Sequence, residues 1–149
     1  MSKRPLGLWL LIITLALLAL GGSAGAYGFL SDPTGAAMGM ALVLDKLPVD
    51  SYFLPGLFLL LAFTVGPLLV IYVLLMRPAW PWLDRRWRAG GAYWGWTASL
   101  GIGPVLGGWL LLQAVLIGFD WPIQWFTAAI NAAVLLFALM LSVRRACRM

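Results

Sequence analysis

The chain has 149 residues, of which 63% are hydrophobic and 10% are charged, and its formal net charge is +5. Because soluble globular proteins carry about 25% charged residues, this composition excludes an ordinary soluble domain and indicates a membrane protein. The sequence contains no histidine and no glutamate, which excludes histidine-ligated haem, zinc sites of the usual kind, Ser-His-Asp triads and HExxH metalloprotease helices.

Four stretches without a charged residue divide the chain. They cover residues 5–31, 51–76, 89–119 and 121–143. Each is longer than the ~20 residues that a helix needs to cross a bilayer, and none shows the alternation of a barrel strand. We therefore expect an all-α membrane protein with one domain over 1–149 and transmembrane helices at about 6–29, 53–76, 92–117 and 123–143.

The first stretch allows two interpretations. Lys3 and Arg4 precede an apolar run that reaches an AGA sequence at 24–26, a pattern typical of a cleavable signal peptide. Apolar residues continue through Leu30, which favours a complete membrane-spanning helix that is retained. The intact mass of the purified protein distinguishes the two, since cleavage would leave three spans.

The sequence SDPTGAAMGM at 31–40 predicts a turn directly after the first helix. Asp32 and Pro33 are typical turn residues. The apolar residues at 38–44 that follow are too few to cross the bilayer. We expect a short interfacial segment in this first outer loop, lying over the outer end of the bundle.

The basic residues predict the orientation of the helices. All of them except Lys46 lie before the first stretch, between the second and third stretches, or after the fourth. By the positive-inside rule, both termini and the middle loop are then cytoplasmic. The predicted location is the cell membrane, which the chain crosses several times.

The cytoplasmic arginines are expected to contact anionic lipid head groups. They are Arg77, Arg85, Arg86, Arg88, Arg144 and Arg145. Tryptophans gather near both ends of the predicted helices, as in the aromatic belts of membrane proteins. The sequence RPAWPWLDRRWR at 77–88 has a composition that also suits nucleic acid, but its place between two spans favours lipid, and we expect no nucleic-acid partner.

Small residues recur every four positions in the third predicted helix. This stripe comprises Gly91, Gly95, Ser99, Gly103 and Gly107, and a shorter one in the first helix comprises Gly21 and Gly25. Such stripes let helix backbones approach closely in lipid, so we expect the third helix to be a central packing element. The pattern does not distinguish packing within the chain from packing against another subunit.

Proline interrupts the second and the third predicted helix. Pro67 and Pro104 each lack a backbone donor, so each is expected to kink or loosen its helix locally.

Uncharged polar side chains gather in one part of the predicted bundle. They are Gln113 on the third helix and, at helical spacing on the fourth, Gln124, Thr127 and Asn131, with Trp109 on the same face as Gln113. One interpretation is an interhelical hydrogen bond, for example between Gln113 and Asn131. The other is a pocket that opens outward and binds a lipid head group, a quinone or another amphiphile.

The stretch DPTGAAMGMALVLDKLPVDSYFLPGL at 32–57 resembles a group of small uncharacterised bacterial membrane proteins of four helices. Those proteins have an Asp-Pro-Ser-Gly loop after the first span. The matching residues are Asp32, Pro33, Gly35, Gly39, Met40, Tyr52, Pro55 and Gly56, followed later by Gly108, Trp109, Gln113 and Trp121. Thr34 replaces the serine, and Ala41 stands where the pattern favours proline. The resemblance implies the four-helix architecture and a bacterial inner membrane, and it implies no mechanism.

The residue inventory favours a protein that is not an enzyme, without catalytic residues, metal or cofactor. We expect an accessory or scaffold subunit that packs against other membrane proteins or associates with itself, because the chain has no soluble domain and carries small-residue stripes. The alternative is a binding or carrier protein for a lipid, quinone or other amphiphile, which would use the polar residues around Gln113 and Asn131.

Overall fold

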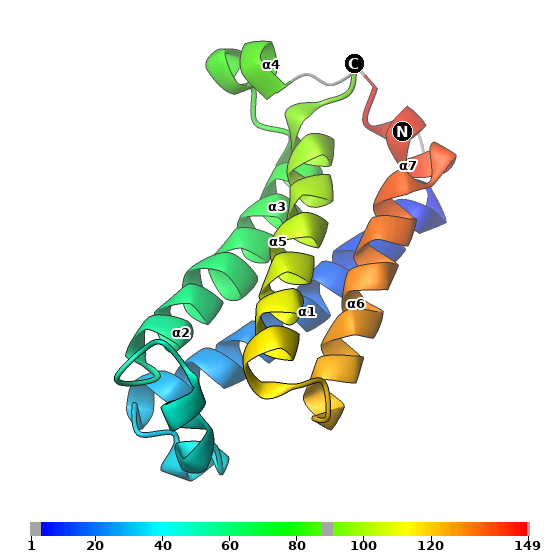
Figure 1. The fold of residues 1–149 in the computed structure, drawn as a ribbon. Coiled ribbons are helices and arrows are strands. Elements are labelled where there is room, and N and C mark those ends of the chain that lie inside the picture. The colour runs from blue at the N-terminus through cyan, green and yellow to red at the C-terminus, as the bar shows by residue number, and fades with distance from the viewer. Residues whose placement is uncertain (1–3, 88–90, 149) are drawn as a thin grey trace.

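The computed structural model describes residues 4–87 and 91–148 and shows a bundle of helices (Figure 1). Within that part of the chain there is no β-strand, and an isolated bridge joins Ala92 to Arg148. Four helical segments are long and apolar enough to cross a membrane. The prediction of an all-helical protein with four candidate membrane-spanning helices is therefore confirmed.

Short elements connect the four apolar segments. The apolar segments are α1 (Leu6–Ser31), the continuous run of α2 (Phe53–Phe58), η3 (Leu59–Val65) and α3 (Gly66–Met76), then α5 (Trp94–Ile117) and α6 (Pro122–Leu139). The short elements are the 3-10 turns η1 (Ala36–Met38) and η2 (Ala41–Lys46) and the helices α4 (Pro81–Trp87) and α7 (Leu141–Ala146).

The second apolar segment changes its helical form at its centre. η3 is a π-helix, whose turns are wider than those of an α-helix. It ends directly before Gly66 and Pro67, and proline has no N–H to donate to the carbonyl one turn earlier. The wider turn agrees with the loosening expected at Pro67, whereas Pro104 lies inside α5 without interrupting it.

The fourth apolar segment is divided. α6 ends at Leu139, Met140 has an extended ψ of 133°, and α7 begins directly after it. The indole N–H of Trp96 donates a 2.8 Å hydrogen bond to the Ala138 carbonyl, which is one of the last carbonyls that α6 cannot satisfy itself. The single helix predicted over 123–143 is therefore two helices, because a contact with α5 supplies a partner for the end of α6.

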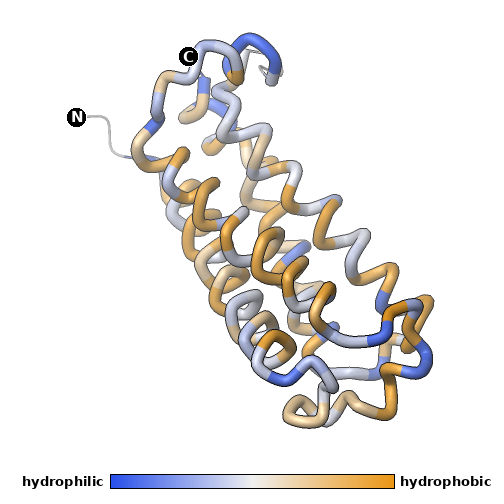
Figure 2. The backbone as a smooth tube through the Cα atoms, turned by 90° about the vertical axis from the view of Figure 1, so that its left-hand side faces the viewer, coloured by the Kyte–Doolittle hydropathy of each residue, from blue (hydrophilic) through white to orange (hydrophobic). Residues whose placement is uncertain are grey.

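The four apolar segments form a ring. α1 packs against α2, η3, α3 and α6, while α5 packs against α3 and α6. The start of α1 lies at one end of the bundle with α4 and α7, and we call this the basic end (Figure 1). Residues 32–52 and the turn at 118–121 lie at the other end, which we call the loop end. Figure 2 shows apolar residues along the helices and strongly hydrophilic ones mainly at the two ends.

The most buried of the four segments is α1. Half of its apolar window is buried, compared with 17% of that of α5. Within this chain α1 is therefore the more buried element, and one face of α5, the third apolar helix, is uncovered. Gly101 and Gly108 lie on this face, and a Cβ added at either would meet nothing within 4 Å.

Two glycines of the α5 stripe lie at close helix contacts. A Cβ added at Gly95 would lie 2.6 Å from Val73 of α3, and one added at Gly103 would collide with Leu135 of α6. The stripe therefore serves packing within the chain at these positions.

The other members of the α5 stripe have different surroundings. Ser99 is buried, and its hydroxyl donates a 2.7 Å hydrogen bond to the Trp96 carbonyl. Gly107 faces the Asn131 side chain of α6, 3.4 Å from an added Cβ. Gly91 precedes α5 with a φ of 77°, so it belongs to the loop rather than to the helix.

Two glycines of α1, Gly22 and Gly25, face the second apolar segment, not α5. A Cβ added at Gly22 would lie 2.5 Å from the backbone oxygen of Phe63, and one added at Gly25 would lie 3.0 Å from Leu59. Next to Gly21 there is open space. At Gly22 the backbone of the π-helical η3 thus lies close against α1.

The half of the bundle toward the basic end is well filled. Its fully buried side chains include Leu8, Leu11, Leu15, Val134 and Val143. The Tyr93 amide donates a 2.7 Å hydrogen bond to the Cys147 carbonyl, and the Arg77 guanidinium donates to the Ala146 carbonyl. These bonds join the end of the chain to the α3–α5 connection.

Candidate functional site

A cavity of about 160 Å³ lies inside the bundle in the half toward the loop end. Trp109 and Gln113 of α5 and Gln124 and Thr127 of α6 line it, so the structure brings these four predicted residues together. Asn131 does not line this cavity. Of the five predicted ligand-binding residues, Asn131 thus lies apart from the other four.

Glycines of α1 make room for this cavity. Gly21, Gly22 and Gly25 form part of its wall opposite α5. Since α1 and α5 are not close neighbours in the ring, the space between them must be filled by side chains. Toward the basic end leucines of α1 fill it, whereas at these glycines no side chain does.

A second cavity, of about 260 Å³, lies between α2, α5 and the residues at 47–49. Trp109 and Gln113 line this cavity as well. The Trp109 ring lies 4.8 Å from the Phe58 ring and 6.4 Å from the Phe63 ring, measured between centroids. Trp109 and Gln113 are therefore shared by two adjacent cavities.

The loop between α1 and α2 covers the cavities at the loop end. Met40 lines both of them, and its carbonyl accepts a 2.9 Å hydrogen bond from the Tyr52 hydroxyl. The Tyr52 ring stacks on Phe29 of α1 at 4.5 Å, and the Tyr52 amide donates to the Pro33 carbonyl at 2.8 Å. Tyr52 therefore holds the loop onto α1. Gly35 lies beside this ring with a φ of 76°, and a Cβ there would lie 2.5 Å from the ring.

Asp32 organises the first turn of this loop. Its carboxylate accepts hydrogen bonds from the Thr34 hydroxyl at 2.6 Å and from the Ala37 amide at 2.8 Å. These bonds, the one from Thr34 above all, lower the pKa of Asp32 below its usual value.

Gln124 and Thr127 already have hydrogen-bond partners. The Gln124 amide group donates to the Gly118 carbonyl at 3.0 Å, and its oxygen accepts from the Trp121 amide at 3.1 Å. The Thr127 hydroxyl donates to the Ile123 carbonyl at 2.7 Å. Gln124 therefore shapes the turn between α5 and α6, and the hydroxyl hydrogen of Thr127 is used within its own helix.

Gln113 and Asn131 do not bond to each other. Asn131 faces Gly107 at the α5–α6 contact, whereas Gln113 faces the two cavities, so the predicted interhelical bond between them is absent. Among the described residues, the Asn131 side-chain oxygen is buried without a hydrogen-bond partner. Gln113 makes no hydrogen bond with any described residue, which leaves its amide facing the cavities unused.

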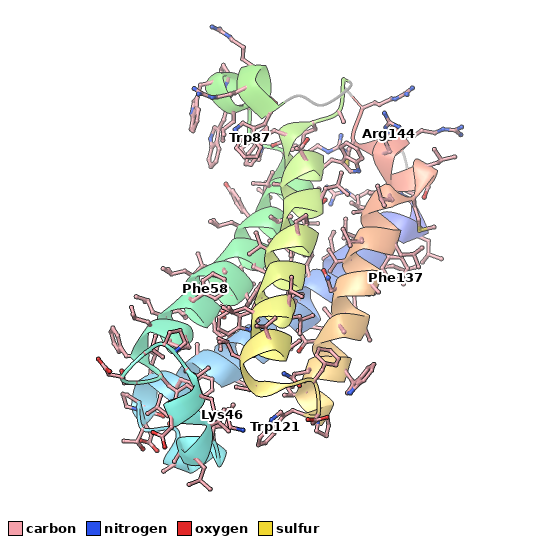
Figure 3. All side chains as sticks on the ribbon, viewed as in Figure 1. Lys46, Phe58, Trp87, Trp121, Phe137 and Arg144 are labelled. Atoms are coloured by element: carbon pink, nitrogen blue, oxygen red, sulfur yellow. The ribbon has the colours of Figure 1, made fainter. Side chains whose placement is uncertain are left out.

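The predicted lipid-contact arginines lie at the basic end. Arg77, Arg85, Arg86, Arg144 and Arg145 are exposed there, and Arg88 lies outside the described residues. The Arg144 guanidinium lies 5.6 Å from the centroid of the Trp96 ring. Figure 3 shows Arg144 and Trp87 at this end and Trp121 at the other.

Sequence reasoning missed several residues of the site. Phe29, Phe58, Phe63 and the residues at 47–49 line the cavities, and nothing in the sequence distinguishes them from their apolar neighbours. Met40 belongs to the resemblance at 32–57, which assigns it no place at a cavity. The aromatic and Pro-Gly sequence after Tyr52 resembles that of other proteins, but nothing in it predicts contact with α5.

Searches against protein families, curated proteins and solved structures find no match to the chain. The resemblance at residues 32–57 therefore stays a prediction. Within residues 4–87 and 91–148, no three potential metal ligands lie together.

Proposed function

We propose that this protein is a non-enzymatic binding or carrier protein of the cell membrane, which holds a membrane amphiphile in the cavities around Trp109 and Gln113. The observation that carries the proposal is that these two side chains line two adjacent cavities, of about 160 and 260 Å³. Small-molecule sites are typically concave and mostly apolar, with a few polar groups that fix the orientation of the ligand.

The lining favours an amphiphile with an uncharged polar group. Every lining residue found in the described part of the chain is uncharged, and most are aliphatic or aromatic. The Gln113 amide can both donate and accept a hydrogen bond. It suits a carbonyl, hydroxyl or ester group of a lipid or a quinone, with the apolar part of the molecule against Trp109.

The charge distribution supports an orientation with both termini in the cytoplasm. The described basic residues other than Lys46 lie at the basic end, while Asp32, Asp45, Asp50 and Asp120 belong to segments at the loop end. By the positive-inside rule the loop end then faces outward. In this orientation η1 and η2 lie at the outer interface above the cavities, and the exposed arginines meet anionic lipid on the inner side.

Purification in mild detergent, followed by mass spectrometry of the retained lipids, tests the binding function. We expect a specific amphiphile to copurify with the wild type and to be depleted about tenfold in Gln113→Leu, the ratio for a loss of about 1.4 kcal/mol. Asn131→Leu is the matched control, because this amide lies outside the cavities. Equal retention in Gln113→Leu and the wild type would contradict the proposal.

A second candidate function is that of an accessory subunit, which packs against another membrane protein or a second copy of the chain. The uncovered face of α5, with Gly101 and Gly108, favours it, because small residues allow another helix to approach. We expect the double substitution Gly101→Leu and Gly108→Leu to abolish copurification of the partner while amphiphile retention is unchanged. A wild type that is monomeric in mild detergent and has no reproducible partner would rule this function out.

A further inference from the structure

The cavity between α1 and α6 has an open side formed by exposed residues. Leu17 of α1 and Ile123 and Phe126 of α6 line the cavity, yet their side chains are 46%, 63% and 55% exposed. Gly21, also exposed, lies beside them on α1. Residues that both line a cavity and face the surroundings mark its rim.

The opening arises because α1 and α6 separate toward the loop end (Figure 1). At the basic end a Cβ added at Gly7 of α1 would lie 3.0 Å from the Ser142 and Val143 side chains of α7, directly after α6. Four turns later, a Cβ added at Gly21 would meet nothing within 4 Å. The gap beside Gly21 is thus a consequence of helix divergence together with the missing side chain.

The rim has the chemistry of a surface that faces lipid. Its four residues are apolar and belong to two apolar segments that are long enough to cross a membrane, with Leu17 and Gly21 inside α1 and Ile123 and Phe126 in the first turns of α6. In a bilayer this part of the surface meets hydrocarbon chains. A water-soluble molecule does not reach such an opening, whereas a lipid chain lies directly against it.

We propose that the gap between α1 and α6 beside Gly21 is a lateral portal, through which one hydrocarbon chain of a membrane lipid enters the cavity from the bilayer. This inference rests on the proposed binding function and adds the class of ligand and its route. The hydrocarbon chain of the lipid passes between Gly21 and Phe126 and ends against the Trp109 ring. There the contacts of Trp109 with Phe58 and Phe63 close the path.

The second cavity has exposed lining residues too, but its open side differs. Leu54 of α2 and Leu112 of α5 are exposed there, and the residues at 47–49 form part of its wall. Loop residues Met38 and Met40 line the first cavity as well, but its exposed rim residues Leu17, Gly21, Ile123 and Phe126 all belong to α1 and α6. The rim beside Gly21 is therefore formed by apolar helices alone.

Photo-crosslinking in lipid nanodiscs tests the portal. The probe is a phosphatidylglycerol that carries a diazirine in one acyl chain, and labelled positions are mapped by peptide mass spectrometry. The readout is the labelling of buried cavity residues relative to exposed ones on the same helix. Leu106 lines the cavity and is fully buried, whereas Val115 is 75% exposed and reports contact with surrounding lipid.

The variant that tests the route is Gly21→Trp, and its matched control is Gly101→Trp. Both positions have open space for a new side chain, so both variants are expected to fold. We expect Gly101→Trp to retain the labelling ratio of the wild type and Gly21→Trp to lower it about tenfold. Phe126→Ala, which widens the gap without adding volume, is expected to raise it.

The outcomes separate the two proposals. If buried cavity residues are labelled equally in the wild type and Gly21→Trp, and Phe126→Ala changes nothing, the portal is refuted and the binding function stands. Loss of labelling in Leu112→Trp instead would place the route on the α2–α5 side and also refute the portal. If Leu106 is not labelled in the wild type, both the binding of a lipid chain and the portal fail.

Discussion

The two halves of this bundle are built from the same four apolar segments, yet one is filled and the other is hollow. Toward the basic end Leu8, Leu11 and Leu15 of α1 are at most 1% exposed, and they occupy the centre of the ring. Toward the loop end the same helix contributes Gly21, Gly22 and Gly25, and a cavity lies in front of them. The size of the side chains on α1 therefore decides which half is filled.

Glycine has opposite effects in adjacent positions of α1. At Gly22 it permits the backbone of η3 to approach so closely that a Cβ would lie 2.5 Å from the Phe63 oxygen. At Gly21 it leaves open space at the rim of the cavity. The two neighbours thus separate the role of glycine in close packing from its role in creating a void.

Substitution of Gly22 by valine is expected to have the largest effect. Its Cβ would collide with backbone atoms of Phe63, which cannot move away as a flexible side chain can, so we expect a loss of about 3 kcal/mol in the free energy of unfolding. Gly21→Val is the control and is expected to change stability by no more than about 0.5 kcal/mol. Unfolding in mixed detergent micelles measures both, and equal losses would show that the difference between the two sites is not real.

Truncation of leucine is expected to show the next largest effect and to differ between the halves. Leu11 and Leu18 are almost equally buried, with 0% and 4% exposure, but only Leu18 lines the cavity. In the filled half Leu11→Ala leaves a new void, and we expect a loss of about 2 kcal/mol. Leu18→Ala only enlarges an existing cavity and removes fewer contacts, so its loss should be smaller.

The same unfolding titration distinguishes these two variants. A loss in Leu18→Ala as large as that in Leu11→Ala would mean that the half toward the loop end is as well packed as the other. Retained lipid is removed before the measurement, since a bound molecule would stabilise the folded state by mass action.

The sequence predicts the helices of this protein well, because charge and hydropathy alone determine where a chain can cross a bilayer. The four charge-free stretches correspond to α1, the run from α2 to α3, α5 and α6. It does not predict which helix is central. Gly95 and Gly108 are both glycines on α5, yet one lies against Val73 and the other on an uncovered face.

The candidate site is predicted only in part, because helical spacing shows which side chains share a face but not what they contact. Trp109, Gln113, Gln124 and Thr127 share helix faces, which the spacing reveals, and they do line one cavity. Spacing does not reveal what a side chain bonds to, so it misses that Gln124 is used by the turn at 118–121. It also assigns Asn131 to the group, although the crossing of α5 and α6 at Gly107 turns this residue away from the cavity.

Substitution of Gln124 should therefore lower stability, whereas substitution of Gln113 should lower lipid retention. Both substitutions should change stability less than the leucine truncations do. Gln124→Leu removes the hydrogen bonds to the Gly118 carbonyl and the Trp121 amide, and we expect a loss of about 1 kcal/mol. Gln113→Leu breaks no hydrogen bond to a described residue, so stability should be unchanged while lipid retention falls. Thermal unfolding of delipidated protein provides the measurement, and the reverse order of stabilities would contradict these roles.

The smallest expected effect concerns Asp32, in the loop that covers the hollow half. Because its hydrogen bonds from Thr34 and Ala37 lower its pKa in the folded state, ionised Asp32 stabilises this turn above the ordinary pKa of about 3.9. That contribution is lost as the pH falls through the lowered folded pKa. Asp32→Asn removes the titration, so we expect the wild type to be slightly more resistant than the variant to proteolysis of the loop near neutral pH. With an acid-active protease at a pH well below the lowered pKa of folded Asp32, where the carboxyl group is protonated, the two proteins should be cleaved at the same rate. A difference that persists unchanged at low pH would show that the charge of Asp32 does not hold the loop over the cavities.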